Sequence, residues 1–316
     1  MEKQATRDAY GQALVELGHL HDDIVVLDAD LSSSTKTAGF GKAFPARFIN
    51  AGIAEQNMIG MAAGLAAAGK TVFASSFAIF AVGRAFEQVR NSLAYANLNV
   101  KVCATHAGLT VGEDGGSHQA VEDIAVMRSV PNMCVVVPAD GPSTKAALYR
   151  LYQRKGPAYL RLGRPAVPKI YDGEKIDFVI GKGIELRKGK DVTIIACGIM
   201  VHKSLEAAKL LAEEGIEAAV IDMHTIKPID KELIIKQARS TGAILTVEEH
   251  NIIGGLGSAV AEVVAENHPV FVERLGIEDI FGQSAGPEEL LEHYGLTIQN
   301  IIDKIHLLLN KKKELK

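Results

Sequence analysis

One segment, Phe48–Ala68, constrains the fold more than any other part of the chain. Its sequence, FINAGIAEQNMIGMAAGLAAA, predicts a short strand, a glycine turn and then a helix. From Met58 onward, every side chain of that helix is small or apolar. A helix without a polar face is typical of a buried element, and the run is shorter than the roughly 20 apolar residues of a membrane span. We therefore expect a buried helix, which another backbone can approach closely at Gly60 and Gly64.

This helix carries one carboxylate near its start, Glu55. A carboxylate at the mouth of an apolar helix either pairs with a cation or takes up a proton more readily than in water. Such a setting is typical of groups that do proton chemistry. The plainer interpretation is a glutamate of the first turn that stabilises the helix N-terminus, and the remaining motifs decide between the two.

Length and composition are those of an ordinary chain of two domains. The 316 residues are 47% hydrophobic and 23% charged, with a net charge of −4, so the composition indicates no nucleic-acid partner. Cys103, Cys134 and Cys197 lie far apart in apolar runs, which favours buried thiols of a reducing compartment over disulfides or a metal site. The charged N-terminus lacks the apolar core of a signal peptide. We expect a cytoplasmic protein that binds neither nucleic acid nor membrane.

Strand and helix signals alternate along both halves of the chain, which is typical of parallel α/β sheets. Proline, glycine and charge replace the alternation near residues 165–175, where we expect a boundary. The expected domains are residues 1–170 and 171–316, each a three-layer α/β domain with a mainly parallel sheet. In the first domain we expect strands at residues 24–31, 48–50, 71–76 and 100–105, and a long helix at about 77–96.

Carboxylates and hydroxyl groups follow the first of these strands. Asp28 and Asp30 lie near its C-terminal end, and the serines of LSSST come directly after them. Ligands of open α/β sheets bind beyond the carboxyl ends of the strands. We therefore expect this edge of the sheet to carry the functional site.

The loop from His106 to His118 directly follows a buried strand and contains many ionisable residues. It includes Glu113, Asp114 and four glycines, which allow the backbone to wrap closely around a ligand. Two histidines could exchange protons with a substrate's oxygen atoms near neutral pH. A metal site is the competing interpretation, but no cysteine is near and the histidine spacing fits no common ligand pattern. We interpret the loop as a substrate-binding element.

Two further groups have an ordinary structural interpretation beside a functional one. Phe77 and Phe80 are three residues apart, so they share one helix face, either as core residues or as a platform for a ligand ring. Arg161 and Arg164 follow an apolar strand, and with Arg7 they offer the planar fork that suits phosphate. Each arginine alone is more typical of a salt bridge.

Taken together, these segments resemble transketolase, and the resemblance covers essentially the whole chain. It is carried, in order, by ATRDAYGQAL, DADLSSST, INAGIAEQNMIGMAAGLA, FAIF, THAGLTVGEDGGSHQAVEDIA, PNMCVVVPAD, LRLGRP and VEEHNIIGGLGSAVAE. The resemblance implies the pyrimidine-binding and C-terminal domains of a thiamine-diphosphate-dependent transferase. The implied reaction moves a two-carbon ketol unit from a ketose phosphate to an aldose phosphate.

The resemblance also implies roles for single residues. Glu55 matches the glutamate that contacts the aminopyrimidine of thiamine diphosphate, where a carboxyl group favours the tautomer that takes the proton from the thiazolium carbon. Phe80, with Phe77, matches the aromatic residues of the pyrimidine pocket, and Asp30 matches an aspartate near the cofactor. By the same matching, His106, Asp114 and His118 bind the sugar's hydroxyl groups and assist proton transfer, and Arg7, Ser34 and Arg164 hold the sugar phosphate.

The chain departs from complete transketolases in one respect. Their first domain binds diphosphate and Mg²⁺ through Gly-Asp-Gly and a later Asn, and this sequence has no Gly-Asp-Gly. We therefore expect one half of a split transketolase of the pentose phosphate pathway. It would work with a separate N-terminal subunit that supplies the metal ligands, in an assembly of two of each chain.

Three alternatives stay open at this point. Deoxyxylulose-phosphate synthase shares GIAEQ and LTVGEDG-like features in its C-terminal part, and the β subunit of 2-oxoacid dehydrogenases resembles YLRLGRP. His106 together with GEDGGSH favours transketolase over both. A non-catalytic α/β binding module is the third alternative, and it is disfavoured because a buried, unpaired carboxylate at Glu55 is costly without a use.

Overall fold

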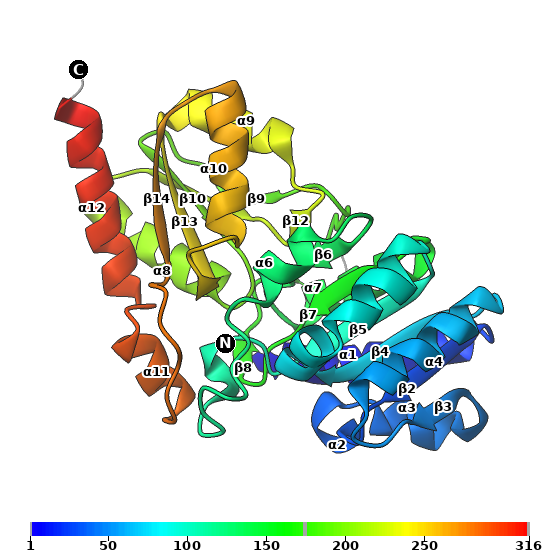
Figure 1. Ribbon diagram of the computed structural model, residues 1–316. Helices are drawn as coiled ribbons and strands as arrows, with labels where there is room; N and C mark the ends of the chain where they lie inside the picture. The colour runs from blue at the N-terminus through cyan, green and yellow to red at the C-terminus, as the bar shows by residue number, and fades with distance from the viewer. Residues whose placement is uncertain (1, 173–175, 315–316) are drawn as a thin grey trace.

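Two mainly parallel sheets organise the computed structural model, which describes residues 2–172 and 176–314 (Figure 1). The first sheet has seven strands in the order β12-β6-β7-β5-β4-β2-β3, and only β12 runs antiparallel to its neighbour. The expected α/β fold is confirmed. The strands are β2 Ile24–Asp28, β3 Phe48–Asn50, β4 Thr71–Phe77, β5 Val100–Thr105, β6 Cys134–Val136, β7 Ala158–Arg161 and β12 Thr225–Lys227.

Helices cover both faces of this sheet because its central strands are apolar on both sides. In β2, Ile24 and Val26 face one core, while Val25 and Leu27 face the other. The first core is closed by helices that include α1 and α7, and the second by helices that include α4 and α6. The helical segments are α1 Thr6–Leu20, α2 Ser32–Thr35, α3 Ala38–Ala43, η1 Pro45–Arg47, α4 Glu55–Ala67, η4 Leu109–Val111, α6 Asp123–Ser129 and α7 Gly141–Gln153.

The long helix expected from Phe77 begins later and is irregular. Phe77 is the last residue of β4, because it pairs with Thr105 of β5 and the sheet continues through it. The helix that follows is wound partly as a π-helix, in which the amide of Ala85 donates to the carbonyl of Phe80 at 3.3 Å. Its segments are η2 Ile79–Arg84, α5 Phe86–Gln88 and η3 Val89–Tyr95.

Helix α4 is not fully buried, so the prediction from its apolar sequence is wrong in part. Met58, Ile59 and Ala62 are buried against the sheet. Gly60 and Gly64 lie on the opposite, exposed face, and a Cβ atom added at either one would meet no atom within 4 Å. The sheet covers only one side of the helix, and Figure 1 shows α4 on the side of the molecule away from the second sheet. Among residues 2–172 and 176–314, no backbone makes the close approach that these glycines permit.

The second sheet has five strands in the order β14-β13-β10-β11-β9. Strand β9 pairs antiparallel with β11 at the sheet edge and is only half-buried, so its sequence has no apolar run that would have predicted it. Helix α12 packs along the outside of this sheet (Figure 1). The strands are β9 Ile184–Arg187, β10 Val192–Ala196, β11 Ala218–Asp222, β13 Ala243–Asn251 and β14 Phe271–Ile277, and the helices are α8 Met200–Glu213, α9 Lys231–Thr241, α10 Leu256–Asn267, α11 Pro287–His293 and α12 Ile298–Glu314.

The two halves of the chain interlock near the expected boundary. Strand β12, from the second half, joins the first sheet beside β6. Within residues 165–175, β8 Ala166–Pro168 pairs antiparallel with β1 Lys3–Ala5, and the carboxylate of Asp140 accepts hydrogen bonds from the amides of Ile170 and Tyr171 at 2.7 and 3.0 Å. Residues 173–175 of the expected boundary lie outside the described residues. The division at residue 170 stays a prediction.

Two further findings concern composition. The three cysteines are buried free thiols, as expected. Among the described helices, none combines the length and the apolar character needed to cross a membrane.

Candidate functional site

The carboxyl ends of β2, β3, β4 and β5 meet at one edge of the first sheet. Asp28 at the end of β2 lies opposite Asn50 and Ser75, and Phe77 lies opposite Thr105. The segments that follow these strands therefore start side by side. They include the turn at Asp30, the helix that begins with Glu55, η2 and the loop that begins at His106.

Glu55 is buried at this edge, with 2% of its surface exposed, and it has a cationic partner. Nη1 of Arg84 lies 3.0 Å from Oε2 of Glu55, and the Arg84 side chain is half exposed. The guanidinium group of Arg84 also lies over the ring of Phe80, 4.8 Å from its centroid. The other carboxylate oxygen of Glu55 has no hydrogen-bond partner among the described residues. Arg84 was not among the predicted site residues, although Phe80 and Arg84 are at the (i, i+4) spacing of neighbours on a helix.

Aromatic rings line the site beyond this ion pair. The rings of Phe77 and Phe80 are nearly parallel, with centroids 6.1 Å apart. Phe77 stacks on the imidazole of His106, with centroids 3.8 Å apart, and the rings of His118 and Phe80 are nearly perpendicular, with centroids 5.4 Å apart. Phe80 is only partly buried. The rings of Phe80 and Phe77 therefore connect Arg84, the partner of Glu55, to His118 and His106.

His106 is held in one neutral tautomer. Nη1 of Arg7 lies 3.0 Å from Nε2 of His106, and an arginine can only donate, so Nε2 accepts. The proton of the neutral ring is then on Nδ1, which lies 2.9 Å from the hydroxyl of Thr105. Burial, together with the positive charges of Arg7 and Arg164, lowers the pKa of His106 to about 3. His106 also has a positive φ of 57° and is 3% exposed, so its ring is firmly placed.

Cationic groups converge beside His106. Nη1 of Arg7 also donates to the backbone carbonyl of Ser34 at 3.1 Å. The pKa of Arg7 is lowered by burial and by the charge of Arg164, against the opposing effect of Asp8. Positive charges that disfavour one another in a partly buried site are stabilised when an anion binds between them. This part of the edge is therefore a candidate anion site.

Arg164 and the carboxylates of the loop form a separate, more exposed group. Arg164 donates to the carbonyl of Val111 and pairs with Glu113 at 3.3 Å and with Asp114 at 3.9 Å. Nδ1 of His118 lies 3.0 Å from the hydroxyl of Ser117. Asp114 and His118 therefore lie on one loop, of which His118 contacts Phe80 and Asp114 contacts Arg164.

The structure brings most of the predicted site residues into one series of contacts, while Arg164 and Asp114 belong to the separate group on the loop and Asp30 lies apart. A continuous series of contacts connects Glu55, Phe80, Phe77, His118, His106, Arg7 and Ser34, through Arg84. Asp30 is exposed and exchanges hydrogen bonds with Asn50, at 2.9 and 3.1 Å, rather than with this series. Its positive φ of 65° forms the turn after β2.

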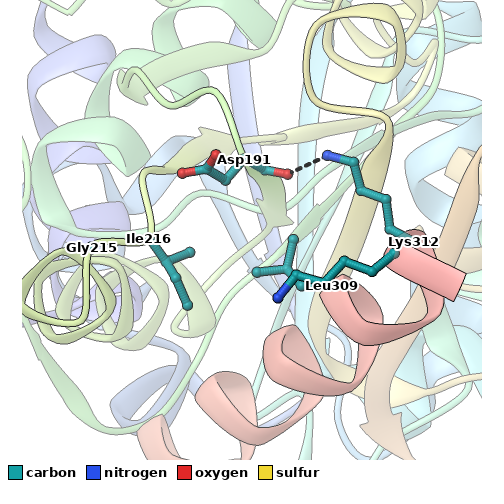
Figure 2. A pocket seen from close by; sticks show the side chains of 6 residues that line it. Asp191, Gly215, Ile216, Leu309 and Lys312 are labelled. Atoms are coloured by element: carbon teal, nitrogen blue, oxygen red, sulfur yellow. Dashed lines mark hydrogen bonds between the residues drawn. The ribbon is translucent and has the colours of Figure 1, made fainter. Parts of the chain in front are cut away.

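Other charged groups have structural partners. Arg161 is buried and pairs with Asp123 at 2.7 Å, so the salt-bridge interpretation applies to it. A surface pocket beside α12 contains Asp191, Leu309 and Lys312 (Figure 2), but the ammonium group of Lys312 donates to the backbone carbonyls of Asp191 and Thr241. Across residues 2–172 and 176–314, no group of three or more His, Cys, Asp or Glu side chains is arranged to hold a metal ion.

Comparisons with known proteins agree with this geometry. The family model of the transketolase pyrimidine-binding domain matches residues 2–169, and that of the transketolase C-terminal domain matches residues 181–301. A protein of Methanocaldococcus jannaschii described as a transketolase C-terminal section is 54% identical over 95% of this chain and 94% of its own. A 6-deoxy-6-sulfo-D-fructose transketolase subunit of a Clostridium species is 44% identical over 99% of this chain and 97% of its own. A solved structure of a split-gene transketolase, an inactive β4 tetramer, is 55% identical with a TM-score of 0.90, over 98% of this chain and 99% of its own.

Proposed function

The chain belongs to the transketolase family, whose members are transferases, and we propose that it is the C-terminal subunit of a split, thiamine-diphosphate-dependent transketolase. It would transfer a two-carbon ketol unit from a ketose phosphate to an aldose phosphate. The observation that carries the proposal is the unbroken series of contacts from the buried acid Glu55, through Arg84 and the rings of Phe80, Phe77 and His106, to the cationic site at Arg7.

The residues at the acid end fit the aminopyrimidine ring of thiamine diphosphate. One oxygen of Glu55 is paired with Arg84, and the other has no hydrogen-bond partner among the described residues, so it can share a proton with a ring nitrogen. Phe80 offers a partly exposed aromatic face beside it, on which a flat ring can stack. When bound, thiamine diphosphate supplies the electron sink that lets a carbon–carbon bond next to a carbonyl group break.

In this proposal the chain's own residues hold protons and orient the sugar. Glu55 holds a proton at the pyrimidine nitrogen, in a site where burial and Arg84 fix its direction. His118, whose ring is nearly perpendicular to that of Phe80 at 5.4 Å, is assigned to proton transfer with the sugar's oxygen atoms. Asp114, on the same loop, is assigned to a sugar hydroxyl group. Asp30 is assigned to the neighbourhood of the cofactor, as the resemblance implies.

The cationic end is assigned to the phosphate of the sugar. Arg7, Arg164 and the segment of Ser34 would hold the phosphate oxygens. His106 is neutral and its Nε2 lone pair is occupied by Arg7. Its contribution in this arrangement is therefore to bind and orient. His106 becomes available for proton transfer only if Arg7 turns toward the phosphate.

A second subunit would complete the site, supplying the diphosphate site and the Mg²⁺ ligands. Two features of this chain support a partner surface beside Glu55. The face of α4 that carries Gly60 and Gly64 is uncovered, and Ile53, just before the helix, is 78% exposed. We propose two copies of each subunit, and self-association of the isolated chain is compatible with the β4 tetramer of the split-gene relative.

The test is an assay of the chain mixed with a candidate N-terminal subunit, thiamine diphosphate and Mg²⁺. We expect glycolaldehyde transfer from xylulose 5-phosphate to ribose 5-phosphate, as in the pentose phosphate pathway. Consumption of pyruvate with glyceraldehyde 3-phosphate would instead indicate the synthase, and pyruvate-dependent lipoyl acetylation the dehydrogenase. Because one relative is named for a sulfosugar, 6-deoxy-6-sulfo-D-fructose is tested as a donor in parallel. Absence of turnover with every substrate would contradict the proposal and favour a binding module.

A further inference from the structure

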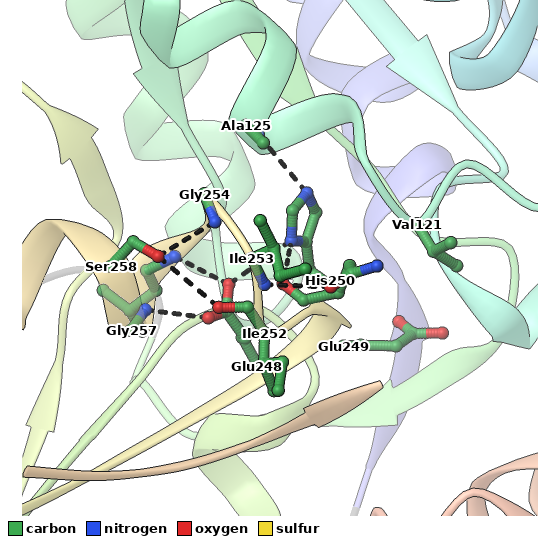
Figure 3. Close-up of polar contacts among 12 residues, drawn as sticks. Val121, Ala125, Glu248, Glu249, His250, Ile252, Ile253, Gly254, Gly257 and Ser258 are labelled. Carbon is green, nitrogen blue, oxygen red and sulfur yellow. Dashed lines mark hydrogen bonds and ion pairs between the residues drawn. The ribbon is translucent and has the colours of Figure 1, made fainter. Parts of the chain in front are cut away.

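The loop Gly108–Gln119, here called the substrate loop, rests on the second half of the chain. Its backbone amide at Thr110 donates to Oε1 of Glu249, a residue of β13 in the second sheet, at 2.7 Å. Glu249 is buried, with 4% of its surface exposed. Figure 3 shows Glu249 and its neighbour Glu248 pointing in different directions, with Glu248 turned toward Gly257. Only Glu249 therefore reaches the substrate loop.

Glu249 lies so close to Gly108 that a side chain at position 108 would have no room unless Glu249 moved. Gly108 has a positive φ of 82°, and a Cβ atom at this position would lie 2.3 Å from Cδ of Glu249. The backbone carbonyl of Glu249 accepts a hydrogen bond from Nη2 of Arg161 at 3.0 Å, and the same nitrogen lies 3.2 Å from the carbonyl of Ala120. The side chain of Glu249 thus holds the start of the loop, and Arg161 connects the backbone of Glu249 to that of Ala120, the residue after the loop.

The rest of the loop rests on the segment between β14 and α11. Nε2 of Gln119 donates to the carbonyls of Leu109 and Gln283 at 3.2 and 2.9 Å, which joins both ends of the loop to that segment. A Cβ atom at Gly116 would lie 2.5 Å from the carbonyl oxygen of Gly282. The hydroxyl of Ser284 donates to the carbonyl of Glu113 at 2.5 Å. The second half therefore contacts the loop at its start, middle and end.

We propose that the second half of the chain positions the substrate loop for sugar binding, with Glu249 as the principal positioning residue. This inference rests on the proposed function, in which Asp114 and His118 of the loop contact the sugar. The loop contains four glycines, and glycine loses more conformational freedom on ordering than any other residue. Without an anchor, each binding event would have to order the loop and would lose affinity. The contact series from Glu55 to Ser34 contains no side chain of the second half. In this proposal the second half contributes to sugar binding by anchoring the substrate loop.

The anchor is tested in the isolated chain by amide hydrogen exchange, which needs neither partner nor turnover. In Glu249→Ala we expect exchange at residues 109–119 to accelerate by at least ~10-fold, because the acceptor of the Thr110 amide is gone. Glu249→Gln keeps an oxygen acceptor at the same place and should retain most of the protection. Glu248→Ala is the matched control. Glu248 accepts from the amides of Leu256 and Gly257 at 2.7 Å, so exchange should accelerate at the start of α10 and not in the loop.

The consequence for the sugar is tested in the assembled enzyme. We expect Glu249→Ala to raise the KM for the sugar phosphate at least ~10-fold while the Kd for thiamine diphosphate is unchanged, and Glu249→Gln to restore the KM. If Glu249→Ala does not fold, Ser284→Ala tests the anchor at the middle of the loop by the same two measurements. Unchanged loop exchange would overturn the anchor, and a loosened loop with an unchanged KM would overturn its role in sugar binding. If no assembly is active, the proposed function fails while the exchange result still decides the anchor.

Discussion

At the scale of single residues, burial determines which polar groups need partners, and the partners indicate function. Glu55 is buried but paired with Arg84, so the protein keeps an acid at the edge of the sheet without leaving it uncompensated. His106 is also buried, and its hydrogen bonds with Arg7 and Thr105 fix which ring nitrogen carries the proton. Three predictions belong to this scale.

The first concerns Glu55. Replacement of Glu55 by Gln should lower kcat of the assembled enzyme by at least ~100-fold, because proton transfer by a positioned side chain contributes about 10²–10⁴-fold. Steady-state kinetics with saturating cofactor measure this effect. Glu213→Gln, at an exposed position in the last turn of α8, is the control and should leave the rate unchanged. A near-normal kcat in Glu55→Gln would remove this residue from the proton relay.

The second concerns Arg84. In Arg84→Ala the carboxylate of Glu55 stays buried and loses its cation, so the free energy of unfolding should fall by about 1–3 kcal/mol, less than for a fully buried pair because Arg84 is half exposed. Urea denaturation of the isolated chain measures the change. In the Glu55→Gln background the same substitution should cost much less. Equal costs in both backgrounds would show that the ion pair contributes nothing.

The third concerns pH. Burial raises the pKa of Glu249 from 4.5 to about 7. Between these values the unfolded chain has lost the proton that the folded chain still binds, so the contribution of Glu249 to stability decreases as pH rises. Glu249→Gln removes this dependence. Relative to the wild type, the variant should therefore gain up to ~3 kcal/mol on going from about pH 5 to about pH 8. A constant difference in unfolding free energy between the two proteins would contradict the prediction.

At the scale of elements, α4 has one face on the sheet and one face of small residues that no other described residue covers. Glycine in an exposed helix interior destabilises the helix by roughly 0.5–1 kcal/mol relative to alanine. Two such glycines on an uncovered face fit a surface at which another chain approaches closely. The loss of helix stability that these glycines cause in the isolated chain would then be offset by the contacts that they allow in the assembly.

Substitution at Gly64 separates the effect of this glycine on the stability of the isolated chain from its effect on assembly with the partner subunit. Gly64→Ala should stabilise the isolated chain by about 0.5–1 kcal/mol, since a Cβ atom there meets open space. Gly64→Leu should leave the isolated chain folded but weaken its assembly with the partner subunit, measured by sedimentation. Lys209→Leu on the exposed side of α8 is the matched control. Undiminished assembly of Gly64→Leu would mean that this face of α4 is not an interface.

Sequence patterns predicted the elements where periodicity and local turns determine them. The strands at residues 48–50 and 100–105 were predicted with the bounds that the structure has, because their apolar runs end at clear breaks. The end of β4 at Phe77 was missed because it depends on pairing with Thr105. The partnership of Arg84 with Glu55, the uncovered face of α4 and the joining of β12 to the first sheet were also missed. Each depends on contacts between distant parts of the chain.

At the scale of the whole molecule, the chain holds an acid, an aromatic row and a candidate anion site at one edge of its first sheet, and its second sheet contacts the substrate loop through Glu249. The described residues contain no cluster arranged to hold a metal ion. In the proposed function, a second subunit holds the diphosphate and its metal. In this proposal the active site is divided between two chains.

The most direct measurement of that claim is a titration of this chain with its candidate partner, with thiamine diphosphate and Mg²⁺ present and ketol transfer as the readout. We expect no turnover by either protein alone and a rate that saturates at equal amounts of the two. Turnover by the isolated chain, with tight binding of the cofactor and its metal, would contradict the proposed division of the active site.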